Sequence, residues 1–137
     1  MSTKQTGDET EAKVMSWLIA AGYTVSVPFG DNEKYDLVLD TGAELVRVQC
    51  KTGWREEDGA VLRFKTTSKT TVDGTVTRVD YGETINAFAV RCPVTDKLYW
   101  VPVEEAGSKS TYLRLKSPKI DHPSVNLAAE YRFDEVL

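Results

Sequence analysis

The stretch YDLVLDTGAELVRVQCKTG, residues 35–53, predicts two apolar strands joined by a short turn at residues 41–42. Side chains alternate between the two faces of a strand, so Gln49 and Lys51 project together from one face of the second strand. Asp36 adds a carboxylate at the start of the first strand. Polar groups among residues destined for a core need partners, and these three side chains therefore mark a candidate site.

A helix is predicted over residues 7–21, ahead of these strands. Thr6 followed by Glu9 fits a capping box, and Gly22 follows the last apolar residues. Apolar side chains recur at helical spacing and predict a core-facing stripe made of Val14, Trp17, Leu18 and Ala21.

Glu11 extends this apolar stripe by one turn toward the N-terminus. A carboxylate on a buried face is costly unless it is paired, hydrogen-bonded or bound to a cation. The alternative is a solvated first turn, and periodicity alone leaves both interpretations open.

The rest of the chain predicts further strands and one long polar segment. Strands are expected at 23–28, where Pro28 ends the run, at 61–67 and 111–116, and in a hairpin over 88–103. Residues 66–81 are rich in Thr and Ser and predict a long exposed loop or a flexible hairpin. A short helix is expected within residues 124–133.

Composition limits the class of protein. With 137 residues we expect one domain over 1–137. No run is long and apolar enough for a membrane span, no signal-peptide pattern is present, and the expected location is cytoplasmic. Cys50 and Cys92 lie in apolar runs and are expected to be reduced core residues. His122 is the single histidine, which argues against most catalytic triads and zinc sites.

Four polar residues could form one catalytic site if the helix packs beside the two strands. Glu11, Asp36 and Gln49 supply the hard oxygen ligands that Mg²⁺ accepts. Lys51 could orient or help deprotonate a water molecule, and its charge could stabilise a pentacovalent phosphate. This combination suits hydrolysis of a phosphodiester.

The pattern of Asp36, twelve intervening residues and then Gln49-Cys50-Lys51 resembles the signature of the PD-(D/E)XK nuclease superfamily, with Gln in place of the usual second acid. The chain most resembles the group I intron-associated homing endonucleases of that superfamily. The strings that carry this resemblance are TGDETEAKV (6–14), GYTVSVPFGDNEKYDLVLD (22–40), VQCKTG (48–53) and FAVRCPVTDKLYWVPV (88–103). The resemblance covers roughly the first 105 residues.

The resemblance implies a Mg²⁺-dependent DNA endonuclease, for which Mn²⁺ is a possible substitute. It implies that Glu11 and Asp36 are metal ligands, that Gln49 is a polar metal-site residue and that Lys51 lies at the attacking water. The implied fold is α/β (α+β), a restriction-endonuclease-like core with a mixed central sheet flanked by helices. The implied assembly is a homodimer or a homotetramer built as a dimer of dimers.

Glutamine at position 49 changes the charge of the expected metal site. It keeps an oxygen ligand but removes a negative charge, and Glu11 restores that charge. With two carboxylates instead of three, we expect modest cation affinity until phosphate oxygens of DNA complete the coordination shell.

Local basic segments oppose the net charge of −4, which by itself argues against a general polyanion binder. Residues 107–120 carry four basic side chains and no acid, and residues 51–72 carry five against three acids. If Arg63 and Lys65 lie on a two-stranded ribbon, they and Lys69 or Arg78 could enter a major groove. The alternative is a solvated surface. The candidate contacts to double-stranded DNA are Arg55, Arg63, Lys65, Lys69, Arg78, Lys109, Arg114, Lys116 and Lys119.

The favoured function is sequence-specific cleavage of both DNA strands by a homing-type endonuclease. One alternative is a Holliday-junction resolvase or another structure-selective nuclease. A non-catalytic DNA-binding module is a second alternative, to which Gln49 lends weight. Trp17 and Trp100 fit the core, whereas Trp54 follows the catalytic strand and could touch DNA or a partner subunit.

Overall fold

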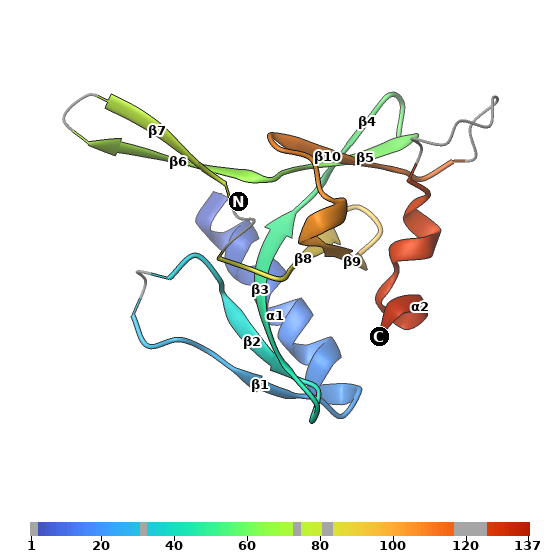
Figure 1. The fold of residues 1–137 in the computed structure, drawn as a ribbon. Helices are drawn as coiled ribbons and strands as arrows, with labels where there is room; N and C mark the ends of the chain where they lie inside the picture. Colours follow the sequence, from blue (N-terminus) through green and yellow to red (C-terminus); the bar gives the residue numbers. More distant parts are fainter. Residues whose placement is uncertain (1–2, 31–32, 73–74, 81–83, 117–125) are drawn as a thin grey trace.

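The computed structural model describes residues 3–30, 33–72, 75–80, 84–116 and 126–137, with the side chains of 68–80 excepted. Figure 1 shows one long helix, α1 (Thr3–Ala20), packed against a central sheet. The sheet has the strand order β1-β2-β3-β8-β9. Strands β3 and β8 are parallel and the other neighbours are antiparallel, which confirms a mixed central sheet. The strands are β1 (Thr24–Ser26), β2 (Leu37–Asp40), β3 (Leu45–Thr52), β8 (Ala87–Cys92) and β9 (Lys97–Pro102).

A second, three-stranded antiparallel sheet covers part of the central one. Its order is β10-β5-β4, with β4 (Trp54–Glu56), β5 (Val61–Lys65) and β10 (Ser110–Arg114). Strands β6 (Thr67–Val72) and β7 (Thr75–Asp80) form a two-stranded ribbon that projects from the body (Figure 1). Short helical turns complete the described elements: η1 (Val103–Glu105), η2 (Ala128–Tyr131) and α2 (Phe133–Val136).

Helix α1 starts and ends earlier than the sequence predicts. It begins at Thr3, so Thr6 lies within the helix and does not cap it. Gly22 does stop the chain from continuing as a helix, because it adopts φ +97° while its N–H donates to the Ile19 carbonyl. Ala21 lies beyond the last turn and is exposed, unlike the fully buried Val14 of the predicted stripe.

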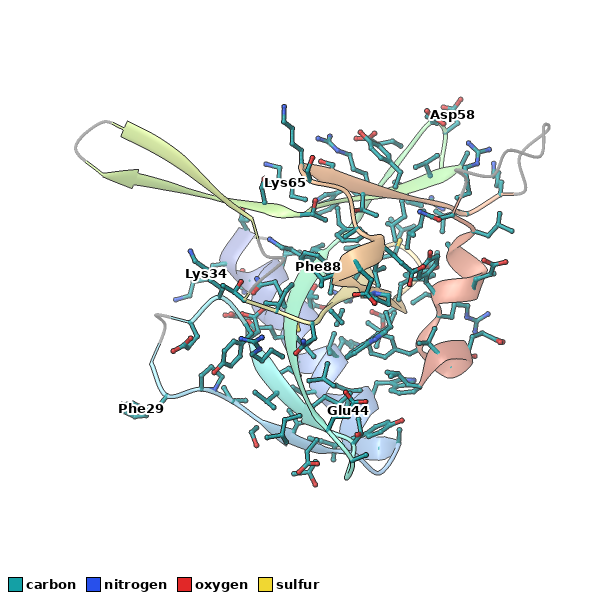
Figure 2. All side chains as sticks on the ribbon, in the orientation of Figure 1. Phe29, Lys34, Glu44, Asp58, Lys65 and Phe88 are labelled. Atoms are coloured by element: carbon teal, nitrogen blue, oxygen red, sulfur yellow. The ribbon has the colours of Figure 1, made fainter. Side chains whose placement is uncertain are left out.

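Two apolar clusters pack on opposite faces of the central sheet. Val14 and Leu18 of α1 pack on one face against residues such as Val48 and Cys50 of β3. On the other face the core lies between the two sheets, where the rings of Phe64 and Phe88 meet edge to face at 5.6 Å. Figure 2 shows Phe88 inside the molecule, at the centre of this packing.

Several predictions of local structure are confirmed. The 88–103 hairpin is present as β8 and β9, and the Thr-rich segment is the β6–β7 hairpin. Cys50 and Cys92 are free and buried. Trp17 and Trp100 both pack edge to face on Phe133.

The placement of the basic strand residues differs from the ribbon hypothesis. Arg63 and Lys65 lie on β5 of the three-stranded sheet, whereas Lys69 and Arg78 occupy paired positions of the ribbon. Strand β5 ends at Lys65 and β6 begins at Thr67, so the three-stranded sheet leads almost directly into the ribbon. His122 and Lys119 lie outside the described residues. No helix in the described part of the chain is long and apolar enough to cross a membrane.

Candidate active site

Asp36 lies where β2 begins beside β3. Its N–H donates to the Val48 carbonyl at 2.8 Å, and its Oδ2 accepts the N–H of Cys50 at 2.8 Å. Burial raises the pKa of the Asp36 carboxyl above its ordinary value, while the bond from Cys50 and the charge of Lys51 lower it. Two backbone bonds therefore hold this carboxylate against β3 in spite of the cost of burying it.

Glu11 reaches the same region because α1 packs across the end of β3. The hydroxyl groups of Thr10 and Thr52 are hydrogen-bonded at 2.7 Å, and Thr10 is only 1% exposed. The pKa of the Glu11 carboxyl is raised, first by burial and then by repulsion from Asp36 and Asp8. The helical acid and the strand acid are thus close enough to repel each other.

Cys50 belongs to the apolar cluster under α1, and its thiol senses the charges of both acids. Its pKa is raised well above the ordinary value by burial, with further contributions from Asp36 and Glu11. The thiol therefore stays protonated near neutral pH, which agrees with a packing role for Cys50.

Gln49 and Lys51 are half-buried on the face of β3 opposite Cys50. Lys51 interacts electrostatically with Asp36, because the positive charge of Lys51 favours the ionised Asp36 carboxylate. Gln49 shares the strand face of Lys51. Its contact with the two acids stays a prediction.

The donor chemistry of these side chains fits a hard divalent cation such as Mg²⁺ or Mn²⁺. Burial disfavours the charged forms of both carboxylates, and repulsion from Asp36 further disfavours the charged form of Glu11. A cation would relieve both costs. The described residues contain no cluster of three or more His, Cys, Asp or Glu able to hold a metal, so the fit depends on two acids with the amide oxygen of Gln49.

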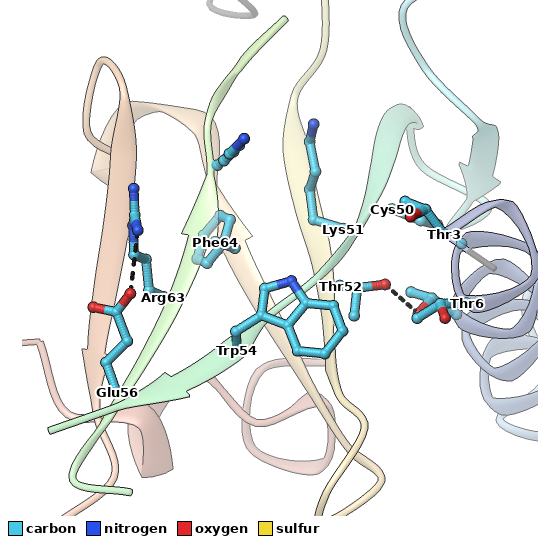
Figure 3. Close-up of a pocket in the computed structure, with 12 residues that line it drawn as sticks. Thr3, Thr6, Cys50, Lys51, Thr52, Trp54, Glu56, Arg63 and Phe64 are labelled. Carbon is cyan, nitrogen blue, oxygen red and sulfur yellow. Dashed lines mark hydrogen bonds and ion pairs between the residues drawn. The ribbon is translucent and has the colours of Figure 1, made fainter. Parts of the chain in front are cut away.

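A pocket of about 460 Å³ opens directly beside Lys51. Figure 3 shows it between the N-terminal half of α1, the end of β3, and strands β4 and β5. Sequence reasoning missed its hydroxyl-rich wall, which becomes visible only when the helix is placed against the strand. The lining residues on α1 and the adjoining end of β3 are Thr3, Thr6, Gly7, Thr10 and Thr52.

Sequence reasoning also missed a cluster of charges that fastens α1 to the β8–β9 turn. The side chain of Arg91 is 7% exposed, and its Nε donates to Asp96 at 2.7 Å and its Nη2 to Glu9 at 3.4 Å. Lys13 pairs with Asp96 at 2.9 Å. Glu9 and Lys13 stand on either side of Glu11 along the helix, so this cluster holds the turn that carries the predicted ligand.

The predicted DNA contacts lie mostly on and around the three-stranded sheet. Alternation along β5 and β10 places Arg63, Lys65 and Arg114 on the face turned away from the core. Arg63 pairs with Glu56 at 3.1 Å and Arg114 with Glu57 at 3.4 Å, so neighbouring acids neutralise part of this surface. Other candidates include the exposed side chains of Arg55, Lys109 and Lys116, and in Figure 2 Lys65 lies on the ribbon side of the sheet.

Comparisons with known proteins agree with this geometry. A family model described as PD-(D/E)XK endonuclease matches residues 1–134. Among solved structures, the bacterial homing endonuclease I-Ssp6803I is similar, with a TM-score of 0.79 and 25% sequence identity over 96% of this chain and 89% of that one. No curated protein sequence matches the chain.

Proposed function

The chain belongs to the PD-(D/E)XK endonuclease family, and from this premise we propose that it is a Mg²⁺-dependent, homing-type endonuclease that cuts both strands of DNA at a preferred sequence. The observation that carries the proposal is that Asp36 lies close enough to both Glu11 and Lys51 for their charges to interact. Asp36 and Lys51 also have the spacing of the family signature. Mn²⁺ would be an acceptable substitute for Mg²⁺. We propose the cytoplasm as its location.

In the proposed site, Glu11, Asp36 and Gln49 hold the cation. A bound divalent cation supplies a Lewis acid for the scissile phosphate and a water molecule of lowered pKa. Lys51 orients that water, and its ammonium group stabilises the negative charge that develops on the phosphate oxygens. The two backbone bonds of Asp36 keep the carboxylate in place before substrate arrives.

The β6–β7 ribbon is the proposed reading element. A two-stranded ribbon fits the major groove of B-DNA, and this one projects away from the body (Figure 1). Lys69 and Arg78 occupy paired positions on it, and both are proposed to contact DNA. The basic residues of β5 and β10 then contact the phosphate backbone.

A double-strand break needs two active sites on opposite strands. We therefore propose that the protein acts as a homodimer or homotetramer, in which each copy cuts one strand.

The test is cleavage of a randomised duplex library in Mg²⁺, followed by sequencing of the cut ends. We expect one recurrent sequence cut on both strands. The matched variant is Lys51→Ala, which should lower the cleavage rate by at least about 100-fold while keeping DNA binding in Ca²⁺.

Three outcomes would contradict the proposal. Cutting of four-way junctions but not of linear duplexes would identify a structure-selective nuclease. Binding without any cutting by the wild-type protein would identify a non-catalytic DNA-binding module. Equal cleavage by wild type and Lys51→Ala would remove Lys51 from the chemistry.

A further inference from the structure

The pocket beside Lys51 has an aromatic wall that the catalytic scheme does not use. Trp54 lines it, and the indole is 58% exposed. Both other tryptophans pack on Phe133, and Trp100 is buried while Trp17 is partly buried. A large apolar ring left in solvent beside an active site needs a functional explanation more than a ring in the core does.

The chain holds Trp54 firmly at a fixed place relative to Lys51. Gly53 separates β3 from β4, and its N–H donates to the Arg91 carbonyl at 2.8 Å. A Cβ atom at Gly53 would lie 2.8 Å from Leu62 Cδ1 and 3.1 Å from Val90 Cγ1, so the backbone must pass through this gap without a side chain. The backbone that carries Trp54 therefore cannot shift without disturbing the packing between the sheets.

Positive charge gathers around this indole. The pocket is lined by Lys51, Arg63 and Lys65 against a single acid, Glu56, whereas the whole chain has a net charge of −4. Figure 3 shows the Trp54 ring between the Arg63–Glu56 pair on one side and the threonines of α1 on the other. Hydroxyl groups and lysines donate hydrogen bonds to phosphate oxygens, and a flat aromatic ring packs against a sugar or a base.

We propose that this pocket is a subsite for one nucleotide of the cut strand, the nucleotide next to the scissile phosphate, with Trp54 packed against it. The proposal rests on the proposed function and adds the place where the strand lies beyond Lys51. The volume of about 460 Å³ is within the range of roughly 300–1,000 Å³ that is usual for small-molecule sites. The phosphate of this nucleotide is bound by Lys65, which lines the pocket and is exposed.

The first test uses thymidine 3′,5′-bisphosphate, a single nucleotide with a phosphate on each side, and the fluorescence of the full-length protein. Since Trp17 and Trp100 pack on Phe133 and do not line the pocket, the ligand should change the emission of Trp54 saturably. The change should vanish in Trp54→Phe. Thymidine without phosphates should bind at least about tenfold more weakly, because it lacks the charged groups.

The matched control is Tyr112→Ala. Tyr112 is 51% exposed and pairs with Arg63 on the side opposite Trp54, but it does not line the pocket. Trp54→Ala should weaken binding by about ten- to a hundredfold, as expected for loss of stacking on a nucleotide, whereas Tyr112→Ala should leave it within about twofold. Equal losses in the two variants would overturn the subsite.

Cleavage separates failure of the subsite from failure of the proposed function. On a duplex that the wild type cuts, Trp54→Ala should raise KM at least about tenfold while Trp54→Phe restores most of the loss. Wild-type cutting with an unchanged KM for Trp54→Ala and no response of emission to nucleotide would overturn the subsite alone. Emission that depends on protein concentration but not on nucleotide would assign Trp54 to contact with a second copy and also overturn it.

Discussion

At the scale of single residues, Gln49 sets the charge of the proposed metal site. The proposed site has two acids, Glu11 and Asp36, whereas three carboxylates are usual in the PD-(D/E)XK superfamily. Replacing Gln49 with Glu restores a third negative charge at a position that already shares the strand face of Lys51. We expect Mn²⁺ to bind on the order of tenfold more tightly to Gln49→Glu, measured by calorimetry without DNA.

The control for this prediction is Gln49→Leu, which keeps the size of the side chain but removes the oxygen ligand. It should bind Mn²⁺ more weakly than the wild type. If Gln49→Glu also bound more weakly, Gln49 would not be at the metal.

Glu11 offers a second prediction at the residue scale, because its raised pKa has a cost that is testable without catalysis. In the absence of metal, a folded-state pKa above the ordinary 4.5 means that folding loses stability as pH rises through the raised pKa. Glu11→Gln should therefore melt higher than the wild type at pH 7 in EDTA, by up to about 3 °C after allowance for solvent screening. The two proteins should melt alike near pH 4 and below.

Metal should reverse that order. Mn²⁺ at neutral pH should stabilise the wild type more than Glu11→Gln, because binding to the folded state adds stability in proportion to affinity. Melting curves from pH 4 to 8, in EDTA and in Mn²⁺, give both comparisons. A lower melting temperature of Glu11→Gln in EDTA at pH 7 would show that Glu11 is stabilised as an anion by the protein alone.

At the scale of elements, helix α1 must be fixed against β3 before its acid can act. Arg91 of β8 fastens the helix to the central sheet through Glu9, and its second partner Asp96 also pairs with Lys13 of the helix. Loss of a buried ion-pair partner costs about 3–5 kcal/mol, but Asp96 and Glu9 are almost half exposed and regain water, so we expect about 1–3 kcal/mol for Arg91→Met. Urea unfolding measures this loss, and Mn²⁺ affinity should fall with it.

The control is Lys13→Met, which removes the other partner of Asp96. The Lys13–Asp96 pair is exposed on both sides, 48% and 46%, so its loss should cost at most about 1 kcal/mol. Equal losses of unfolding free energy in the two variants would mean that the buried Arg91 pairs contribute no more to stability than the exposed Lys13–Asp96 pair.

The elements that sequence reasoning found are those with a clear period. Alternation identified β3 and helical spacing identified α1, because each of these buries one face, whereas β8 is buried along its whole length and is read from its apolar run. The start of α1 was wrong because Thr6 and Glu9 satisfy the capping pattern while the helix continues back to Thr3. Strand β4 has only three residues, all exposed, and leaves no periodic signal.

The candidate site divides in the same way. Position on a strand can be read from the sequence, so Gln49 and Lys51 were placed on one face. The Thr10–Thr52 bond spans 42 positions, and the Arg91–Glu9 pair spans 82. Such contacts depend on how the helix crosses the sheet, which no local pattern specifies.

At the scale of the whole molecule, the fold separates the proposed cutting site from the proposed reading element. The two cores pack on the faces of the central sheet, and the candidate catalytic residues lie where α1, β2 and β3 meet. The ribbon extends away from this body, joined to it through β5 (Figure 1). If its basic residues contact DNA as proposed, they do so away from the candidate catalytic residues.

Shortening the ribbon tests this division. Residues 67 and 80 are paired, so replacing residues 68–79 with Asn-Gly removes Lys69 and Arg78 and closes the chain with a two-residue turn that suits antiparallel strands. The body should keep its melting temperature within a few degrees, because the ribbon projects beyond both cores. DNA affinity in Ca²⁺ should fall by at least about tenfold, since each lost base contact costs roughly 1–3 kcal/mol.

The sharper readout of this variant is the sequence of the cut ends. With its groove contacts removed, the shortened protein should still cut DNA in Mg²⁺, because the residues around β3 are untouched, but it should cut at many more sequences. The control is Lys69→Ala with Arg78→Ala in the full-length ribbon, which should relax the preference in part. A shortened protein that kept the wild-type sequence preference would place base reading on the three-stranded sheet instead of the ribbon.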